Sequence, residues 1–279
     1  MTAPRSSDRS AWLGWLLIVA GWALGLGWLI LGMAIGDTIE VENLGGAMAL
    51  RYAIVFAPLF VIALIFGQLG QVRVLRAGKS PGLWLILGLL LGGTGLGVTV
   101  VYSLLNGGLV PSSAPGVAMT MISLGAALTL VQVAVEEVFF RGWLQQAIDE
   151  RAGSMAAVGL SSIGFAVFHL PAGVTSPISA VTLMLGGVFF GLLALRSGGI
   201  LASIGAHFAW NAIEDQGLGL LYNPGNGMLG SFTDYELLGS ALWGGTEEGL
   251  NASIGTVIVL AALILPLLRQ PAAKATAAA

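Results

Sequence analysis

The sequence predicts an all-α membrane protein, a helical bundle of about eight transmembrane helices with both termini in the cytoplasm. Three observations support this fold class. Apolar residues make up 56% of the 279 residues, charged residues make up only 9%, and the mean hydropathy is +0.91. A soluble domain carries roughly a quarter charged residues, so this chain could not cover a surface that faces water. Most of the chain is therefore expected to face lipid.

Eight apolar runs approach the roughly 20 residues that a spanning helix needs. They cover residues 11–35, 52–70, 83–105, 117–142, 154–170, 177–195, 200–213 and 252–268. Glycines recur four residues apart within these runs, a spacing that lets helix backbones approach closely. The pairs are Gly21 with Gly25, Gly88 with Gly92, Gly93 with Gly97, and Gly187 with Gly191.

The charged residues agree with this number of spans and indicate their direction. With the N-terminus inside, the basic residues fall at cytoplasmic ends of the runs: Arg5, Arg9, Arg73, Arg76, Lys79, Arg151, Arg196, Arg269 and Lys274. The outer segments carry Arg51 as their one base, together with Asp37, Glu40, Glu42, Glu214, Asp215, Asp234, Glu236, Glu247 and Glu248. This distribution follows the positive-inside rule and predicts a multi-pass protein of the cell membrane.

Composition and length set the domain organisation and exclude several classes of protein. The chain has no cysteine, which excludes disulfides, thiolate metal sites and cysteine nucleophiles. Its net charge of −3 and the lack of a basic stripe exclude a nucleic-acid binder. We expect one membrane domain over residues 1–279, with a disordered tail at 270–279. Residues 217–251 are expected to form an outer loop or a short surface element.

Few ionisable residues interrupt the predicted spans. Placing an ionisable side chain inside a membrane costs free energy, so each one indicates a structural or functional role. The polar residues singled out are Glu136, Glu137, Arg141, His169, His207 and Asn211, which include both histidines of the chain. Glu137 and Arg141 are four residues apart on a helix, a favourable spacing for an ion pair. Glu136 points about 100° away from that pair and is left free for proton chemistry.

Helix geometry predicts that these side chains meet. A hairpin centred near residues 152–153 would place Glu136 level with His169, because each lies about 16 residues, or roughly 25 Å, from the turn. His207 and Asn211 share one face of the seventh run. His207 lies at the same depth in the membrane as Glu136 and His169 if the tip of the hairpin projects roughly 10 Å beyond the bilayer. The site then lies about a third of the way into the bilayer from the cytoplasmic side. Residues 171–173, where the fifth helix ends within the bilayer, are expected to line it.

The order of three motifs resembles a known family. Glu136-Glu137-x-x-x-Arg141, Phe165-x-x-x-His169 and His207-x-x-x-Asn211 are similar to the motifs of the CPBP family. That family comprises the type II CAAX prenyl endopeptidases and the bacteriocin-processing proteins, also called Abi. The resemblance covers residues 117–213 and implies a catalytic core there, in an intramembrane endopeptidase whose site is reached from the cytoplasm.

The resemblance also implies roles for single residues. Glu136 would activate water with help from His169, while His207 and Asn211 would bind the scissile carbonyl and its oxyanion. Supporting roles would fall to Glu137, Arg141 and Phe165. The substrate would be a membrane-associated peptide or protein, prenylated or not. The family is described both as metalloprotease-like and as metal-free. His169, His207 and Glu136 could hold Zn²⁺ as three protein ligands, and the sequence leaves both mechanisms open.

Other functions were weighed on the same residues. The zinc-protease motif His-Glu-x-x-His is absent, and Ser161 and Ser162 lack the Gly-x-Ser-x-Gly frame of a serine hydrolase. One alternative is a non-enzymatic membrane protein, an immunity factor or scaffold that needs the polar set only for folding or partner binding. A less favoured alternative is a proton-coupled transporter, because buried Glu and His residues also serve as proton relays.

Overall fold

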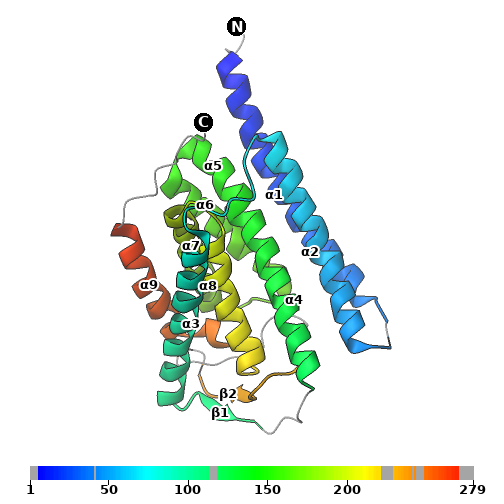
Figure 1. Cartoon of the computed structure of the whole chain (residues 1–279), viewed down its shortest axis with the longest axis vertical. Coiled ribbons are helices and arrows are strands. Elements are labelled where there is room, and N and C mark those ends of the chain that lie inside the picture. The colour runs from blue at the N-terminus through cyan, green and yellow to red at the C-terminus, as the bar shows by residue number, and fades with distance from the viewer. Residues whose placement is uncertain are drawn as a thin grey trace.

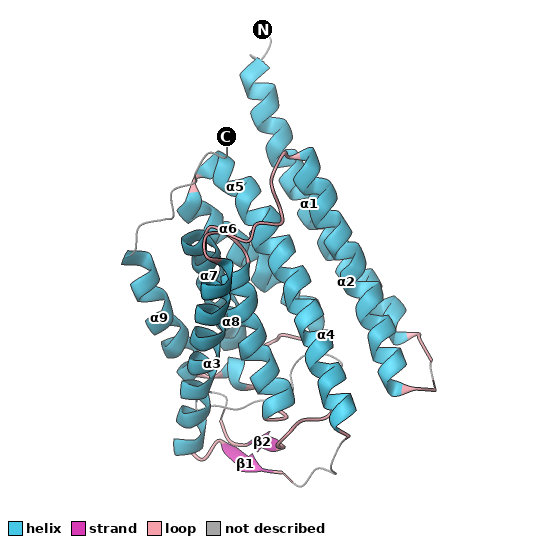
Figure 2. Cartoon of the chain, in the orientation of Figure 1, coloured by secondary structure: helices cyan, strands magenta, loops and turns pink. Residues whose placement is uncertain are grey.

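A computed structural model describes residues 6–40, 42–112, 118–220, 229–240, 242 and 248–269. This part of the chain is almost entirely helical (Figures 1 and 2). The α-helices are α1 (Ser6–Asp37), α2 (Leu44–Leu69), α3 (Pro81–Leu105), α4 (Met119–Glu137), α5 (Gln145–Ala152), α6 (Ser154–His169), α7 (Pro177–Ser197), α8 (Leu201–Ala212) and α9 (Ile254–Arg269). The all-α prediction is confirmed. The tail at 270–279, predicted to be disordered, lies outside the described residues.

Each of the eight predicted runs coincides with a helical segment of this fold. Six segments are long and apolar enough to cross a membrane. The remaining two, α8 and α9, have 12 and 16 residues, which is short of the roughly 20 needed for a complete crossing. Large apolar side chains such as Leu24, Val61 and Leu90 are exposed on the long helices, as expected for surfaces that face lipid. The helices thus indicate a multi-pass membrane protein.

The fourth segment is one continuous helix that changes from α-helical to π-helical hydrogen bonding and back. Between α4 and α5 lies a π-helical stretch, η1 (Val138–Leu144), so that helix runs unbroken from residue 119 to residue 152. The turn that follows is made by Gly153, whose positive φ of 81° favours glycine. Helix α6 then begins at Ser154. The predicted hairpin near residues 152–153 is therefore confirmed.

Small residues let the central helices pack at backbone distance. A Cβ atom added at Gly92 would lie 2.8 Å from Cα and the carbonyl carbon of Ala206 on α8, and a Cβ at Gly88 would meet the backbone of Ala202. The predicted packing role of this glycine pair is confirmed. By contrast, nothing lies within 4 Å of a Cβ built at Gly97. Helix α3 therefore fixes the position of α8, the helix that carries His207.

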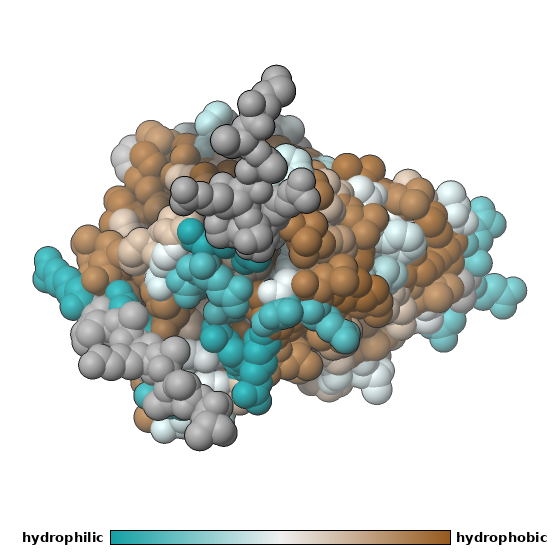
Figure 3. Space-filling model, turned by 90° about the horizontal axis from the view of Figure 1, so that it is seen from above, coloured by the Kyte–Doolittle hydropathy of each residue, from teal (hydrophilic) through white to brown (hydrophobic). Residues whose placement is uncertain are grey.

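Several segments predicted to face the cytoplasm meet at one end of the bundle. The backbone N–H of Ile200 donates to Arg76 O, and that of Lys79 donates to Ser197 O. At the same end Arg196 Nε donates to Leu267 O at 2.8 Å. Figure 1 shows α1 starting at this end, and Figure 3 shows hydrophilic residues gathered over it, with hydrophobic surface on the flanks. The side of the membrane that this end faces stays a prediction.

The opposite end differs from the prediction in one respect. Two short strands, β1 (Leu109–Pro111) and β2 (Tyr235–Leu237), pair there in antiparallel register, which fits the short surface element expected within residues 217–251. The assignment of Glu214 and Asp215 to an outer loop was wrong. Both are buried in a π-helical stretch, η3 (Ile213–Gly217), that continues α8. Glu214 Oε1 accepts a hydrogen bond from the N–H of Leu250, a partner that local sequence does not reveal.

Candidate active site

The buried centre of the site is an ion pair at the junction of α4 and η1. Arg141 Nη1 lies 3.1 Å from Glu137 Oε1, and both side chains are fully buried. Arg141 Nη2 also donates to Gly187 O at 3.0 Å. The ring of Phe165 covers the guanidinium, with 4.5 Å between its centroid and the Arg141 Cζ atom. The predicted pair of Glu137 and Arg141 is confirmed, and Phe165 packs on it.

His207 joins this pair to Glu136. Its Nδ1 lies 2.9 Å from Glu137 Oε1, and because a carboxylate oxygen accepts, Nδ1 carries the hydrogen. Phe190 stacks on the imidazole at 4.5 Å with an interplanar angle of 16°, which fixes the ring plane. The other nitrogen, Nε2, lies 3.9 Å from Glu136 Oε2. The predicted meeting of Glu136 with His207 is thus observed.

The two oxygens of the Glu136 carboxylate have different surroundings. Oε1 accepts a hydrogen bond from Gln132 Nε2 at 3.0 Å, and the Tyr52 hydroxyl donates to Gln132 Oε1 at 3.2 Å. Oε2 is buried and has no hydrogen-bond partner among the described residues. A buried acceptor without a donor is costly, so this oxygen is well placed for a donor from water or substrate. Glu137 is buried completely, whereas 12% of the Glu136 side chain is exposed.

His169 ends α6 and is held by its own helix. Its Nδ1 lies 2.8 Å from Phe165 O. Because a carbonyl oxygen accepts, Nδ1 carries the hydrogen, and Nε2 of the neutral ring is an acceptor. The chain then makes a 3₁₀ turn, η2 (Leu170–Ala172), where the fifth helix was predicted to end.

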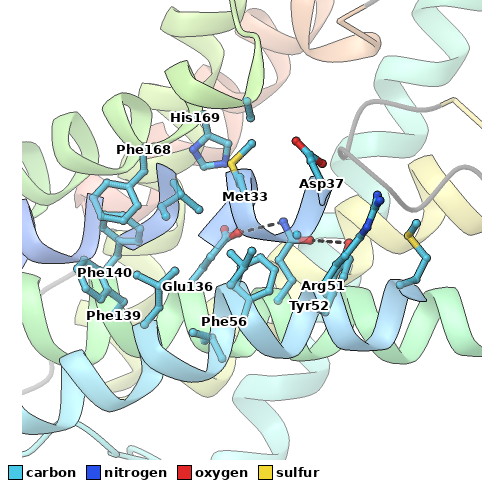
Figure 4. Close-up of a pocket in the computed structure, with 18 residues that line it drawn as sticks. Met33, Asp37, Arg51, Tyr52, Phe56, Glu136, Phe139, Phe140, Phe168 and His169 are labelled. Carbon is cyan, nitrogen blue, oxygen red and sulfur yellow. Dashed lines mark hydrogen bonds between the residues drawn. The ribbon is translucent and has the colours of Figure 1, made fainter. Parts of the chain in front are cut away.

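Two cavities adjoin the polar residues. The first has a volume of about 220 Å³ and lies among α1, α2, α4 and α6, with Glu136 and His169 in its wall (Figure 4). The second, of about 90 Å³, is lined by His207 and Asn211 and also by His169. His169 therefore borders both cavities, whereas Asn211 lines only the one that Glu136 does not. Of the predicted stretch 171–173, Ala172 lines the first cavity.

Three features of the site were missed in the sequence. Gln132 stands four residues before Glu136 in an apolar run, the same signal that singled out the glutamates, and could have been found. Tyr52 offers no such signal, because its contact with Gln132 joins two helices. The π-helical stretch η1, which carries Arg141, also has no marker in the sequence; π-helical turns occur frequently at functional sites.

The side chains present do not fit a metal ion. Among the described residues, no three His, Asp or Glu side chains form a group that could hold one. The predicted zinc ligands His169, His207 and Glu136 therefore do not form such a group. The Nδ1 atom of each histidine is engaged, at Phe165 O and at Glu137 Oε1, so each ring could offer a metal only its Nε2 atom.

A comparison with known families matches the segment that carries these residues. Residues 118–213 match the family described as type II CAAX prenyl endopeptidase Rce1-like. No curated protein and no solved structure matches the chain. The matched segment contains all the motif residues, and the resemblance predicted from the sequence is confirmed over it. At family level the match supports a CAAX-protease-like membrane endopeptidase. It does not support the bacteriocin-processing (Abi) branch or the metalloprotease class.

Proposed function

We propose that the protein is an intramembrane endopeptidase of the cell membrane that hydrolyses a peptide bond in a membrane-associated peptide or protein, using water activated by Glu136. The observation that carries this proposal is the buried Oε2 of Glu136, which lacks a hydrogen-bond donor and faces His207 Nε2 across 3.9 Å. A carboxylate with one oxygen held and the other open can accept a proton from a bound water. The adjoining cavity supplies room for a substrate.

In the proposed reaction, water bound at Glu136 Oε2 gives a proton to this oxygen while its own oxygen attacks the scissile carbonyl carbon. The protonated Glu136 then delivers that proton to the leaving nitrogen as the carbon–nitrogen bond breaks. The acceptor Nε2 of His169 can hold the second hydrogen of the water. Each of these transfers needs only a positioned acid or base, which typically contributes ~10²–10⁴-fold to the rate.

The carbonyl oxygen gains negative charge during the attack and needs donors. His207 Nδ1–H is engaged by Glu137, so Nε2 can donate only when the ring is protonated. The second proposed donor is the amide of Asn211, which lies one helical turn after His207 in the wall of the second cavity, and His169 borders both that cavity and the first. Removing one donor of this kind typically lowers kcat by ~10²–10³-fold.

The test replaces Glu136 with glutamine in protein purified in detergent and measures the cleavage of candidate peptides. Glu136→Gln keeps the volume of the side chain and an acceptor for Gln132, but it removes the base. We expect the rate to fall by ~10²-fold or more. Glu150→Gln is the matched control, because this carboxylate is 51% exposed at the far end of α5. Undiminished cleavage by Glu136→Gln would refute Glu136 as the base.

Three further measurements separate the other functions considered. A scaffold or immunity protein would keep its full cellular function in a stably folded Glu136→Gln variant. A proton-coupled transporter would show uptake driven by a pH gradient in liposomes. Elemental analysis of the active protein decides on a metal: zinc at one per chain, lost in His169→Ala, would contradict a metal-free reaction.

A further inference from the structure

We infer that the second cavity holds water and delivers the water that hydrolysis consumes to His169 and Glu136, from the side away from the substrate. This inference rests on the proposed function, because it names the route by which one of the two reactants arrives. The second cavity lies among α6, α7, α8 and α9, whereas the first lies among α1, α2, α4 and α6. Helix α6 lines both, with His169 at its end.

The first cavity is a poor route for water while a substrate is bound. Hydrolysis of each peptide bond consumes one water molecule. The wall of this cavity is mainly apolar and includes the rings of Phe56, Phe139 and Phe168. An apolar part of a substrate that fills the cavity displaces water from it. The water for the reaction then has to reach Glu136 from another side, and His169 borders the other cavity.

The wall of the second cavity is richer in polar groups. It contains the hydroxyls of Ser179 and Thr182 on α7, the amides of Asn211 and Asn251, and the carboxylate of Glu248. Its volume of about 90 Å³ exceeds the ~10–15 Å³ that a single water needs. Buried polar cavities are hydrated, whereas apolar cavities stay dry. The composition of this wall therefore favours water as the occupant.

The hydroxyl of Thr182 calls for a hydrogen-bond partner inside this cavity. The Thr182 side chain is 3% exposed, and its Oγ1 atom has no hydrogen-bond partner among the described residues. Leaving a buried hydroxyl unpaired costs free energy. Buried waters typically bond to polar groups that the protein itself leaves unpaired. A water beside Thr182 would satisfy this hydroxyl.

His169 connects the water in this cavity to the reaction. Its Nδ1 is held by Phe165 O, so Nε2 of the neutral ring can accept a hydrogen bond from a water. The imidazole also packs on the ring of Phe165, with 4.5 Å between the two centroids. A water that passes this ring enters the wall region that His169 shares with Glu136. There the Oε2 atom of Glu136 lacks a donor among the described residues.

The far end of the second cavity reaches the part of the bundle where α7 begins. Glu248 Oε1 accepts hydrogen bonds from the N–H groups of Thr175 and Ser176, at 3.0 and 2.9 Å. Glu248 and Asn251 are only partly buried, and Thr175 is exposed. Solvent therefore contacts polar side chains at this end of the cavity, which is where water would enter.

The first test maps water in the wild-type protein in detergent. Brief X-ray radiolysis turns water into hydroxyl radicals, which oxidise the side chains beside it, and mass spectrometry measures the oxidation of each residue. Trp210 and Phe190 line the second cavity, whereas Trp143 and Phe189 are buried and line neither of the two cavities. We expect Trp210 and Phe190 to be oxidised several-fold faster than Trp143 and Phe189. Equal rates would mean that the cavity is dry and would overturn the inference.

The second test narrows the cavity and measures peptide cleavage. Gly186 lies in its wall, and a Cβ built there would have only Phe190 Cε2 nearby, at 3.8 Å, so a larger side chain extends into open space. Gly186→Leu should lower kcat by about tenfold or more and leave KM nearly unchanged, because the peptide binds in the first cavity. The matched control is Gly159→Leu on α6, where nothing lies within 4 Å of a Cβ, and it should cleave at the wild-type rate.

The outcomes separate this inference from its premise. A raised KM with an unchanged kcat in Gly186→Leu would mean that the peptide occupies the second cavity, and wild-type values of both would mean that no water passes there; either result overturns the inference. If cleavage depends on Glu136 while Trp210 and Phe190 are oxidised no faster than the buried controls, the inference is wrong and the proposed function stands. If no cleavage depends on Glu136, both fail. Radiolysis uses the wild type, so its result does not depend on how Gly186→Leu folds.

Discussion

Replacing Gly92 with alanine tests whether the packing of α3 against α8 positions the site. A Cβ at this position would lie 2.8 Å from Cα and the carbonyl carbon of Ala206, where ordinary contact begins at 3.4 Å. The carbonyl oxygen of Ala206 would be closer still. Since this neighbour is backbone and cannot rotate away, α8 has to move by at least ~0.6 Å in a closely packed interior. His207 follows Ala206 directly and would move with it.

The displacement should lower both the stability of the fold and the activity. Overpacking of a tight contact typically costs ~1–3 kcal/mol. A shift approaching 1 Å at a catalytic group can lower the rate by ~10²-fold. We therefore expect Gly92→Ala to remain folded in detergent with a lowered melting temperature, and to cleave peptides ~10–100-fold more slowly than the wild type.

The assay compares thermal unfolding and cleavage rate for Gly92→Ala and for Gly97→Ala. Gly97 lies on the same helix and has nothing within 4 Å of a Cβ, so this control carries the same change without the contact. A wild-type rate in Gly92→Ala, with Gly97→Ala also unaffected, would refute the view that this contact fixes His207.

Three further predictions concern other parts of the fold. Tyr52→Phe removes the hydroxyl that holds Gln132 and should cost ~1 kcal/mol of unfolding free energy, measured by thermal unfolding, together with a several-fold lower kcat. Arg141→Ala leaves the buried carboxylate of Glu137 unpaired and should destabilise the fold by ~3–5 kcal/mol, seen as loss of folded protein in size-exclusion chromatography; a normal yield would contradict this. Burial, followed by the nearby Asp215, raises the pKa of Glu214 to about 8. Glu214 lies beyond α8 and outside the six long apolar helices. Its raised pKa means that stability present below about pH 4.5 is lost as the pH rises to about 8, and Glu214→Gln should flatten this dependence in melting curves.

Local sequence predicted the parts of the structure that depend on neighbours along the helix. The lengths of the apolar runs predicted the helical segments. The separation of four residues along a helix predicted the ion pair of Glu137 and Arg141. The helical rise, counted from the turn at Gly153, placed Glu136 and His169 at one level, and both line the same cavity. These inferences hold because helix geometry is nearly constant.

The rest depends on contacts between distant segments. Glu214 looks like a loop residue until the backbone of Leu250 is found beside it. Tyr52 is 80 residues from Gln132 in the sequence, and no spacing rule joins them. The division of the site into two cavities, with Asn211 in the second, follows from how α7 and α8 pack rather than from any motif.

Cells that carry the wild-type protein or Glu136→Gln at equal levels offer the most direct test of the central claim. Mass spectrometry of their membrane peptides and protein ends would identify cleavage products. We expect new peptide ends in the wild type that vanish in Glu136→Gln while their uncleaved precursors accumulate. Identical peptide ends in both strains would contradict an endopeptidase built around this carboxylate.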